Sequence, residues 1–503
     1  MNDDRALATL YSSDSLLCND DIILSIRAKH SRRIYAGAKL YELRKILPKT
    51  LPRRIFLYEA GRQVITGHII VNHALRGDIQ SLWLRVGELA TTKERFFDYF
   101  SNRDTGCALH IAHSCAYERP ISLAELQMLS PSLKPPQSFL YSGAIETVEH
   151  ALSTAAITNS FLSTQNGIIL RAADSSDSAL FRSLVEQYIP KSYLDTKSEY
   201  GRYIFDSYLA GKDHEGVFTR RKYIFRVNVN DEVAGYTVLT EKIAGTIKTG
   251  PTILKPSQQN KGIGVKLRTL LYAGLKRAGY RKVYCTAPSD NQHVLAYLLE
   301  SGMHVEAHLR KHYHTEHDDL VFGVHLDTQK PQAPRIEMPY NPVDTFYKVR
   351  AKNPKISRFI QENLEHFYLR PPPFWAQTQV KKAAAIARGM KVAVKGRLVY
   401  VGEGSDIYLV ALCVFKRGGS AKLLILSETT CVTSIVHFLR FIEASLKRSK
   451  NHSIKKLYCH VPLGAAFLIE SFNKAEFCLE GILERPYSAR SDMLVYYKPL
   501  VHP

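Results

Sequence analysis

The sequence lacks several features that would place it in a familiar class. Its eight cysteines are scattered and form no C-x-x-C pair, which argues against a zinc site or a disulfide framework. It has no apolar run of about 18 residues, so we expect neither a membrane-spanning helix nor a membrane partner. Residues 1–5 are polar and begin no apolar secretion signal. Together these absences predict a protein of the reducing cytoplasm.

Acidic residues are also in short supply. The chain has 503 residues, with 68 Lys and Arg against 47 Asp and Glu, which gives a formal net charge of +21. Such a balance favours a polyanionic partner, nucleic acid first, although a generally basic surface gives the same count. A hydrophobic content of 45% argues against wholesale disorder. The length indicates about three domains.

The most informative segment is KPSQQNKGIG, from Lys255 to Gly264. It lies between a predicted strand, 246–254, and a helix that continues through Leu267 and Leu275. Main-chain N–H groups at such a helix start, with glycines that let a ligand approach closely, suit a pyrophosphate. No Lys-Ser/Thr pair follows Gly264, which excludes a P-loop, and the third glycine of a dinucleotide fingerprint is missing. A tight turn that merely caps a helix is the alternative.

Read as Q-x-x-G-x-G, the segment resembles the acetyl-CoA loop of the GNAT acetyltransferase superfamily. The predicted order of strands and helices over residues 166–328 is similar to a GNAT domain, including the closing sequence DDLVFGVHL. The resemblance implies a mixed-sheet fold, an N-acetyltransferase activity and acetyl-CoA as co-substrate. The cofactor-binding residues that it implies are Ile253, Leu254, Gln259, Asn260, Lys261, Gly262, Ile263, Gly264, Val265 and Asn291.

Two residues are predicted to act in catalysis. Glu241, at the end of a predicted strand, is a candidate general base, and a solvated strand end is its alternative. Relatives often place a tyrosine, the general acid, four residues before the glycine that follows the last helix. Counting back from Gly302 gives Leu298, whereas Tyr297 lies about 100° further around the helix. Tyr297 would serve only if the helix were locally irregular.

A metal site is not expected. His312, His314, His317, Asp318 and Asp319 are close in sequence, but they fall on a predicted strand-turn-strand. A polar hairpin explains them better than a set of metal ligands.

Residues 20–140 have a different character. Between residues 27 and 54 the chain carries ten Lys and Arg against the single acid Glu42, with Tyr35 and Tyr41 among them. The G-x-K-x-x-E-x-R pattern that starts at Gly37 resembles an ASCH domain, a PUA-like β-barrel associated with RNA binding. Some ASCH proteins are amidohydrolases with threonine at the Glu42 position, so hydrolysis is not expected. A structural cluster of Lys39, Glu42 and Arg44 is the alternative to binding. The predicted nucleic-acid-binding residues are Lys29, Arg32, Arg33, Lys39, Tyr41, Glu42 and Arg44.

The last third of the chain partly repeats the middle. The sequence KLYCHVP from Lys456 parallels KVYCTAP from Lys282, and the elements that follow keep the same order. In place of the glycine loop stands SETTCV, from Ser427 to Val432, where Glu428 would repel a pyrophosphate. We expect this degenerate copy to have a structural or substrate-contacting role.

These patterns predict an α/β (α+β multidomain) protein, in which a PUA-like ASCH barrel precedes two GNAT-like mixed-sheet domains. The first hypothesis for function is an N-acetyltransferase whose ASCH domain recruits an RNA-linked or RNA-associated amine. The second is a non-catalytic RNA-binding adaptor, and the third is a small-molecule acetyltransferase with ASCH as a ligand sensor. The predicted boundaries are 20–140 for the ASCH domain, 141–165 for a linker, 166–328 for the GNAT domain, 329–355 for a linker and 356–500 for the degenerate copy.

Overall fold

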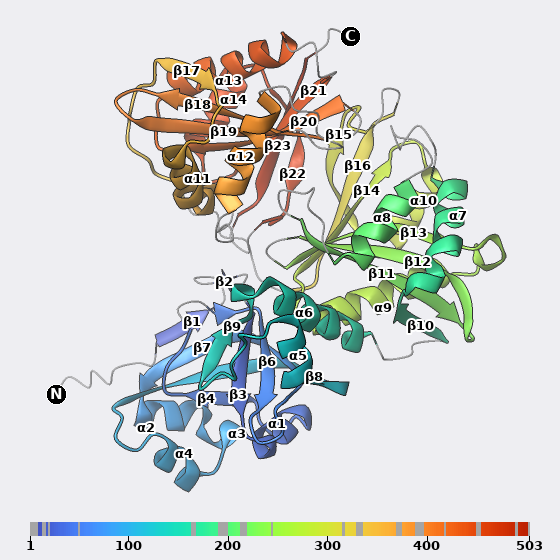
Figure 1. Ribbon diagram of the computed structural model, residues 1–503, viewed down its shortest axis with the longest axis vertical. Coiled ribbons are helices and arrows are strands. Elements are labelled where there is room, and N and C mark those ends of the chain that lie inside the picture. Colours follow the sequence, from blue (N-terminus) through green and yellow to red (C-terminus); the bar gives the residue numbers. More distant parts are fainter. Residues whose placement is uncertain are drawn as a thin grey trace. The chain divides into compact units, whose positions relative to one another are not determined.

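The structure is a computed structural model with mixed α/β architecture (Figure 1). The chain divides into two compact units: Met1–Ala173 with Tyr223–Thr237 and Leu254–Arg281, and Asp174–Lys222 with Val238–Ile253 and Lys282–Pro503. The residues that the structure describes are 9–12, 17–18, 21–48, 51–161, 167–189, 200–211, 219–242, 245–313, 317–327, 335–368, 375–387, 397–416, 419–448, 454–487 and 491–500.

The first unit begins with a seven-stranded sheet. Its strand order is β4-β8-β7-β6-β3-β9, and β1 pairs with β7. Two apolar clusters, on either side of β3 and β6, form its core. The strands are β1 (Thr9–Ser12), β3 (Ile22–Ile26), β4 (Tyr41–Arg44), β6 (Arg54–Glu59), β7 (Val64–Asp78), β8 (Thr105–Ser122) and β9 (Phe139–Tyr141), and β2 (Leu17–Cys18) pairs separately with β5 (Leu51–Pro52).

Short helices surround this sheet. A regular helix, α6 (Glu146–Ser160), lies in the segment expected to be a linker, and its side chains Val148, Leu152 and Ala156 are fully buried in the apolar core. The periodic apolar positions of α6 explain why this segment is folded. The other helices of this region are α1 (Ala28–Tyr35), α2 (Ile79–Leu82), η1 (Trp83–Gly87), α3 (Glu88–Ala90), α4 (Lys93–Tyr99), α5 (Leu123–Leu129) and η2 (Ser142–Ala144).

The first unit also contains the start of the second sheet and a long helix. Strand β10 (Ile168–Ala172) pairs antiparallel with β11 (Thr219–Val229), and β12 (Glu232–Lys242) follows. Helix α9 (Ile263–Arg277) packs closely on the end of α6. Gly274 lies so near the Phe161 ring that a side chain at this position would collide with it. The absence of a Cβ at Gly274 therefore allows this contact.

In the second unit the strand order is β13-β14-β16-β15-β22-β23-β21-β20-β19-β18-β17. The strands are β13 (Thr246–Leu254), β14 (Lys282–Pro288), β15 (His304–Leu309), β16 (Asp319–His325), β17 (Thr345–Lys348), β18 (Arg397–Glu403), β19 (Ile407–Phe415), β20 (Ser420–Ser427), β21 (Lys456–Pro462), β22 (Cys478–Leu483) and β23 (Met493–Pro499). The helices are η3 (Ser175–Asp177), α7 (Ser178–Tyr188), α8 (Tyr200–Leu209), α10 (Gln292–Glu300), α11 (Pro354–Phe367), α12 (Trp375–Ala387), α13 (Val432–Lys447) and α14 (Ala466–Lys474), while η5 (Pro256–Gln258) belongs to the first unit.

The sequence repeat is also a structural repeat. In the first copy β13 runs parallel to β14, with Thr246 opposite Lys282; in the second copy β20 runs parallel to β21, with Ser420 opposite Lys456. The two copies meet where β15 pairs antiparallel with β22, and Ala307 lies opposite Gly481 (Figure 1).

Antiparallel pairing of equivalent residues is what a local twofold axis produces. A side chain at Gly481 would collide with Ala307, so the glycine permits this close approach. None of the helices in the described part of the chain is long and apolar enough to cross a membrane.

Candidate functional site

Strands β13 and β14 begin as a parallel pair and then part. Three residue pairs are formed, the last between Lys248 and Tyr284, although β13 continues to Leu254 and β14 to Pro288. Pro251 lies in the diverging part of β13 and has no N–H with which to extend the ladder. Beyond Lys248 the two strands are no longer paired with each other in the ladder, and this unpaired stretch is called the slot. Unpaired strand edges have the main-chain groups with which an extended chain carrying amide groups would pair.

A turn follows β13 and leads into α9. Lys255 N–H donates to Ala234 O (2.8 Å), and the Gln259 side-chain amide donates to Leu254 O (2.9 Å), so both ends of the turn are fixed. Gly262, with φ of +70°, is the left-handed residue that begins the helix, and an added Cβ there would meet nothing within 4 Å. Asn260, Lys261 and Gly262 are exposed. The turn is open to a ligand.

Buried leucines hold this helix start in place. Ile263 and Leu267 are buried, as are the following positions of the same face, while Gly264 and Val265 are partly exposed. Ile263 therefore anchors the helix with its side chain and has only its main-chain N–H to offer a ligand. The sequence-predicted loop residues, Gln259 to Val265, form one continuous surface at a helix N-terminus.

Asn291 has a structural role in this conformation. Its carboxamide oxygen accepts the Val294 N–H (3.2 Å) and caps α10. Tyr297 lies on α10 and is partly exposed, and the next residue, Leu298, is buried. The helix is regular there, since Ser301 N–H donates to Tyr297 O (3.1 Å). The irregularity that would turn Tyr297 by one position is not present.

Glu241 is not a solvated strand end. Its side chain is fully buried on β12, and its carboxylate lies 3.1 Å from the Arg221 guanidinium on β11. A buried arginine favours the ionised form of a neighbouring carboxylate. This pair ties two adjacent strands together and keeps Glu241 away from bulk water.

Lys39, Glu42 and Arg44 form a buried ionic cluster. Glu42 contacts Lys39 Nζ and Arg44 at 2.7 Å each, and Arg44 also donates to Ser25 O (3.0 Å). Burial works to raise the pKa of Glu42, but the two cations outweigh it and hold the pKa below its usual value. These contacts favour the structural interpretation of Glu42.

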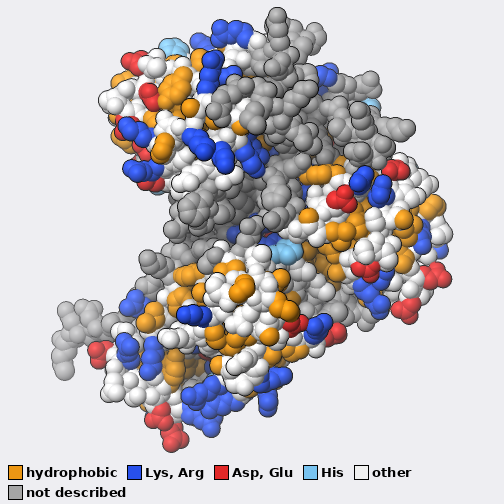
Figure 2. Space-filling model, in the orientation of Figure 1, with side chains coloured by type: hydrophobic (Ala, Val, Ile, Leu, Met, Phe, Trp, Pro, Cys, Tyr) orange, Lys and Arg blue, Asp and Glu red, His pale blue; other side chains and the backbone are white. Residues whose placement is uncertain are grey.

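The basic segment divides into exposed and buried parts. Lys29 and Arg32 are exposed on α1 and Arg33 is partly exposed, whereas Tyr41 packs against the His110 ring, 4.9 Å between centroids. Figure 2 shows Lys and Arg side chains gathered at the lower end of the view, where α1 lies. This helix offers cations to an anionic partner.

Arg53 and Arg54 do not belong to that surface. Arg54 donates to Asp21 Oδ2 from its Nε (2.9 Å) and Nη2 (2.6 Å), and Arg53 adds a second contact. Asp21 is fully buried, and although burial opposes ionisation, the two guanidiniums hold its pKa well below the usual range. Not all ten basic residues of the segment 27–54 are therefore available to a partner, and position in the sequence does not reveal which of them have a buried counterion.

The histidine-rich hairpin does not converge on one point. His312 is buried against the Tyr458 ring, 4.7 Å between centroids, while His317 contacts Asp290 (3.2 Å). The Asp318 carboxylate lies 2.8 Å from His308 Nε2, and the Asp319 carboxylate accepts the Tyr313 N–H (3.1 Å). His314 lies outside the described residues. Each of these side chains binds a different partner, which is the arrangement expected of a polar hairpin.

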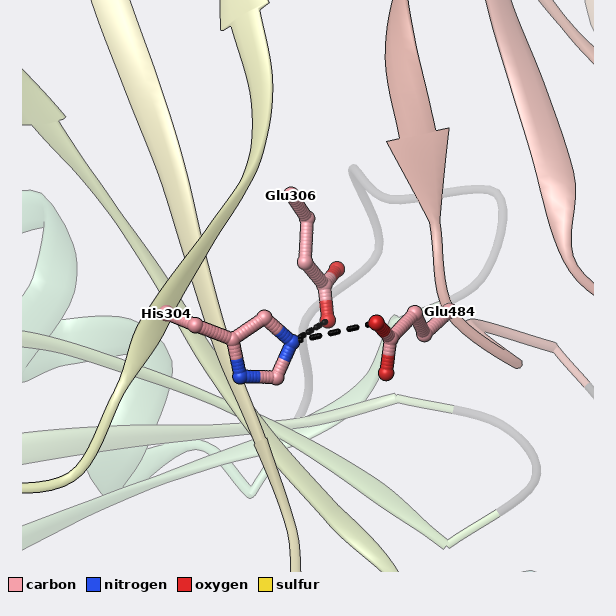
Figure 3. Close-up of side chains that lie close together, drawn as sticks. All are labelled: His304, Glu306 and Glu484. Carbon is pink, nitrogen blue, oxygen red and sulfur yellow. Dashed lines mark hydrogen bonds and ion pairs between the residues drawn. The ribbon is translucent and has the colours of Figure 1, made fainter. Parts of the chain in front are cut away.

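A different trio does converge. His304 Nε2 lies 3.9 Å from Glu306 and 3.2 Å from Glu484 (Figure 3). These ligand atoms lie within 4.8 Å of one another, close enough for a metal. However, the Lys282 ammonium already contacts both Glu306 oxygens, at 2.5 and 2.7 Å. A metal cation here would compete with a buried ammonium, so we interpret the trio as part of an ionic cluster.

The Lys282 cluster has a counterpart in the second copy. Lys456 Nζ contacts Glu480 (2.6 Å), and both glutamates stand at a bulge in their strand. Lys282 also donates to the main-chain oxygen of Glu484, and Lys456 donates to Arg310 O (2.7 Å).

Each lysine therefore binds a carboxylate of its own copy and a carbonyl of the other copy. These pairs were not predicted from the sequence, although the repeated motifs V-E-A-H-L and L-E-G-I-L carry the signal.

Searches with the whole chain gave similar solved structures only. No family model and no curated protein matches the chain. An ASCH protein from Zymomonas mobilis is 24% identical and covers 25% of this chain and 88% of its own, with a TM-score of 0.24. The spermidine N-acetyltransferase of Vibrio cholerae, solved with CoA and spermine, is 18% identical over 32% of this chain and 97% of its own, with a TM-score of 0.28.

A third similar structure is the acetyltransferase of Salmonella typhimurium that modifies the N-terminal serine of a 50S ribosomal subunit protein. It is 19% identical and covers 33% of this chain and 99% of its own, with a TM-score of 0.28. The solved structures similar to parts of this chain thus include both an ASCH protein and GNAT acetyltransferases.

Proposed function

We propose that the protein is an acetyl-CoA-dependent N-acetyltransferase that acts on the amine of an RNA-linked or RNA-associated substrate. Residues 166–328 would be its GNAT domain, 356–500 a degenerate copy and 20–140 an ASCH domain of PUA-like barrel type. The observation that carries the proposal is the exposed turn from Asn260 to Gly262, which opens a helix directly after a strand that has parted from its parallel neighbour.

Each half of acetyl-CoA has a matching feature. The main-chain N–H groups from Asn260 to Val265 would bind the pyrophosphate, assisted by the partial positive charge at the start of α9. The main chain of Ile253 and Leu254, at the end of β13, would pair with the amides of the pantetheine arm. Gln259 would act indirectly, because its side chain already holds Leu254 O and so shapes the turn.

The reaction forms an N–C bond to the acetyl carbon and breaks the C–S bond of the thioester. An alkylammonium with a pKa near 10.4 must first lose a proton to a base or a water chain. We propose Glu241 for the base. Tyr297 is not proposed as the acid that protonates the thiolate, because α10 is regular there, and a proton from solvent would serve instead. Arg221 favours the carboxylate form of Glu241, so Glu241 would accept the proton weakly.

Calorimetry tests cofactor binding. Gly264→Trp places a large side chain in the proposed pyrophosphate site and should weaken acetyl-CoA binding at least ~100-fold, about 2.7 kcal/mol. Thr433→Trp, on the exposed first turn of α13, is the matched control and should leave the affinity unchanged. If Gly264→Trp binds acetyl-CoA with unchanged affinity, the pyrophosphate site does not lie at this turn.

The acceptor can be identified directly. RNA and protein fractions incubated with labelled acetyl-CoA should show the label on an amine by mass spectrometry. Glu241→Gln should lower kcat at unchanged acetyl-CoA affinity, whereas Tyr297→Phe should leave kcat unchanged. A lowered kcat in Tyr297→Phe would show that the tyrosine takes part in the reaction although its helix is regular.

Recruitment of RNA by the ASCH domain rests on the exposed cations of α1. Each phosphate contact releases counterions, so Lys29→Ala with Arg32→Ala should reduce the slope of log affinity against log salt by roughly 0.7 per contact on single-stranded RNA. The control is Lys474→Ala, an exposed lysine of α14. A non-catalytic RNA-binding adaptor, the alternative function, predicts the same salt dependence without any acetyl-CoA binding.

A further inference from the structure

The second copy has its own slot, and a tyrosine lies in it. Strands β20 and β21 pair from Ser420 with Lys456 to Leu423 with Cys459 and then part, as β13 and β14 do. Tyr368, directly after α11, is 4% exposed. Its hydroxyl accepts Ile425 N–H (3.3 Å) from β20 and donates to His460 O (3.1 Å) on β21.

This hydroxyl bridges the two strands just beyond the last ladder pair. Ile425 N–H and His460 O are the main-chain groups that an extended amide chain in the slot would use. Ile425 is buried and His460 is half-buried, so leaving these groups without a partner would cost up to about 1–3 kcal/mol each. Tyr368 therefore supplies the hydrogen bonds that a bound pantetheine arm would otherwise supply.

The start of α13 is also occupied by the chain itself. The segment Pro339–Val343 runs across it: Pro339 O accepts Thr430 N–H (2.8 Å), and Val343 N–H donates to Ser434 Oγ (2.8 Å). Between them, Asn341 exchanges hydrogen bonds with the Thr429 hydroxyl. A pyrophosphate at this helix N-terminus would have to displace the whole segment.

Glu428, the one acidic residue between β20 and α13, is also held by hydrogen bonds. The Asn363 side chain, on α11, donates to the Glu428 carboxylate (2.6 Å), and the Asn341 side chain donates to Glu428 O (3.0 Å). Thr429 is fully buried. The region equivalent to the pyrophosphate turn is thus packed and carries a negative charge.

We propose that the second GNAT-like copy is filled by its own chain, with Tyr368 in place of a pantetheine arm and Pro339–Val343 in place of a pyrophosphate. This copy is a closed scaffold with a latent slot for pantetheine-like amides. One chain consequently binds one acetyl-CoA. That stoichiometry rests on the proposed function, whereas the occupied slot does not.

Thermal unfolding of Tyr368→Ala tests the slot. Removing the phenol should lower Tm, and millimolar pantetheine should raise the Tm of this variant by several degrees more than it raises the Tm of wild type, in which only the first-copy slot is open. The control is Tyr400→Ala, which removes another buried tyrosine, whose hydroxyl contacts Ser445 (3.3 Å) outside the slot. A pantetheine shift in Tyr368→Ala that is no larger than the shift in wild type and in Tyr400→Ala would overturn the proposal.

A milder variant keeps the test valid if Tyr368→Ala does not fold. Tyr368→Phe removes only the bridging hydroxyl, so hydrogen exchange at the Ile425 amide should become at least ~10-fold faster. Tyr400→Phe should leave that amide unchanged. Equal exchange in wild type and Tyr368→Phe would show that the hydroxyl does not hold the strand.

Stoichiometry separates the two proposals. One acetyl-CoA per wild-type chain, lost in Gly264→Trp, supports both. Two per chain would contradict the filled second copy while leaving the enzyme assignment intact. No binding would contradict the proposed function, and the Tyr368 variants would still decide whether the slot is occupied.

Discussion

The two connections that follow the splayed strands differ in chemistry far more than the strands do. In the first copy residues 255–262 form an exposed turn with a left-handed glycine, whereas in the second copy residues 428–431 form a shorter, packed connection. Both lead into a helix, and both follow a parallel pair that parts. The connection, rather than the sheet, therefore decides which copy is able to accept an anionic ligand.

The largest effect should come from the lysines that the two copies share. Lys282→Ala and Lys456→Ala each leave a buried glutamate without its cation, which should cost about 3–5 kcal/mol of unfolding free energy. Because the two environments are equivalent, urea denaturation should give similar losses for both variants.

The control for this comparison is the exposed Lys447, whose partner Glu443 is half-buried and is also contacted by Lys498. Lys447→Ala should cost less than about 1 kcal/mol. A large loss of stability for only one of the two lysine variants would show that their environments are not equivalent.

A second, smaller effect concerns Lys422, which is buried and hydrogen-bonded to His460 Nδ1 (3.0 Å) and to the Tyr487 hydroxyl. Burial lowers the pKa of Lys422 from 10.5 to about 7. Between these values the unfolded chain binds a proton that the folded chain does not. Stability should therefore rise with pH from about 7 to 10.5, on the order of a few kcal/mol in total.

Lys422→Met should remove this rise. Lys248→Met, at the equivalent and partly exposed position of the first copy, should alter the pH profile less. Denaturant titrations from pH 6 to pH 10 measure the difference. Parallel profiles for wild type and Lys422→Met would show that the lysine titrates normally.

The smallest effect is expected at Gly262. Its φ of +70° is unfavourable for other residues, so Gly262→Ala should cost about 1 kcal/mol of stability. Acetyl-CoA affinity should fall only slightly, since an added methyl group meets nothing within 4 Å. Urea denaturation and calorimetry on the same variant check both values. A loss of binding as large as in Gly264→Trp would mean that a Cβ at Gly262 collides with the bound cofactor.

Much of the local structure was predictable because periodicity and turn chemistry act over short distances. The bounds of β13 are those predicted, and the repeat of KVYCTAP in KLYCHVP corresponds to equivalent strands. The glycine turn at the start of α9 was predicted from its residues alone.

Contacts between distant segments were not predictable in the same way. Arg54 and Asp21 are brought together by strand pairing, and Glu241 meets Arg221 across adjacent strands. Tyr368 has no motif around it that reveals its place between β20 and β21. A partner far away in the sequence leaves no periodic signal, so such pairs are found only in the fold.

The reciprocal bonds of Lys282 and Lys456 have a further consequence. In a symmetric homodimer every substitution occurs twice, so neither half is able to lose its ligand site while the other keeps it. Here both halves are covalently one chain, and each lysine reaches the main chain of the opposite half. Because the two halves are fused, one half can lose its ligand site and serve as a structural support while the bonds between the halves are kept.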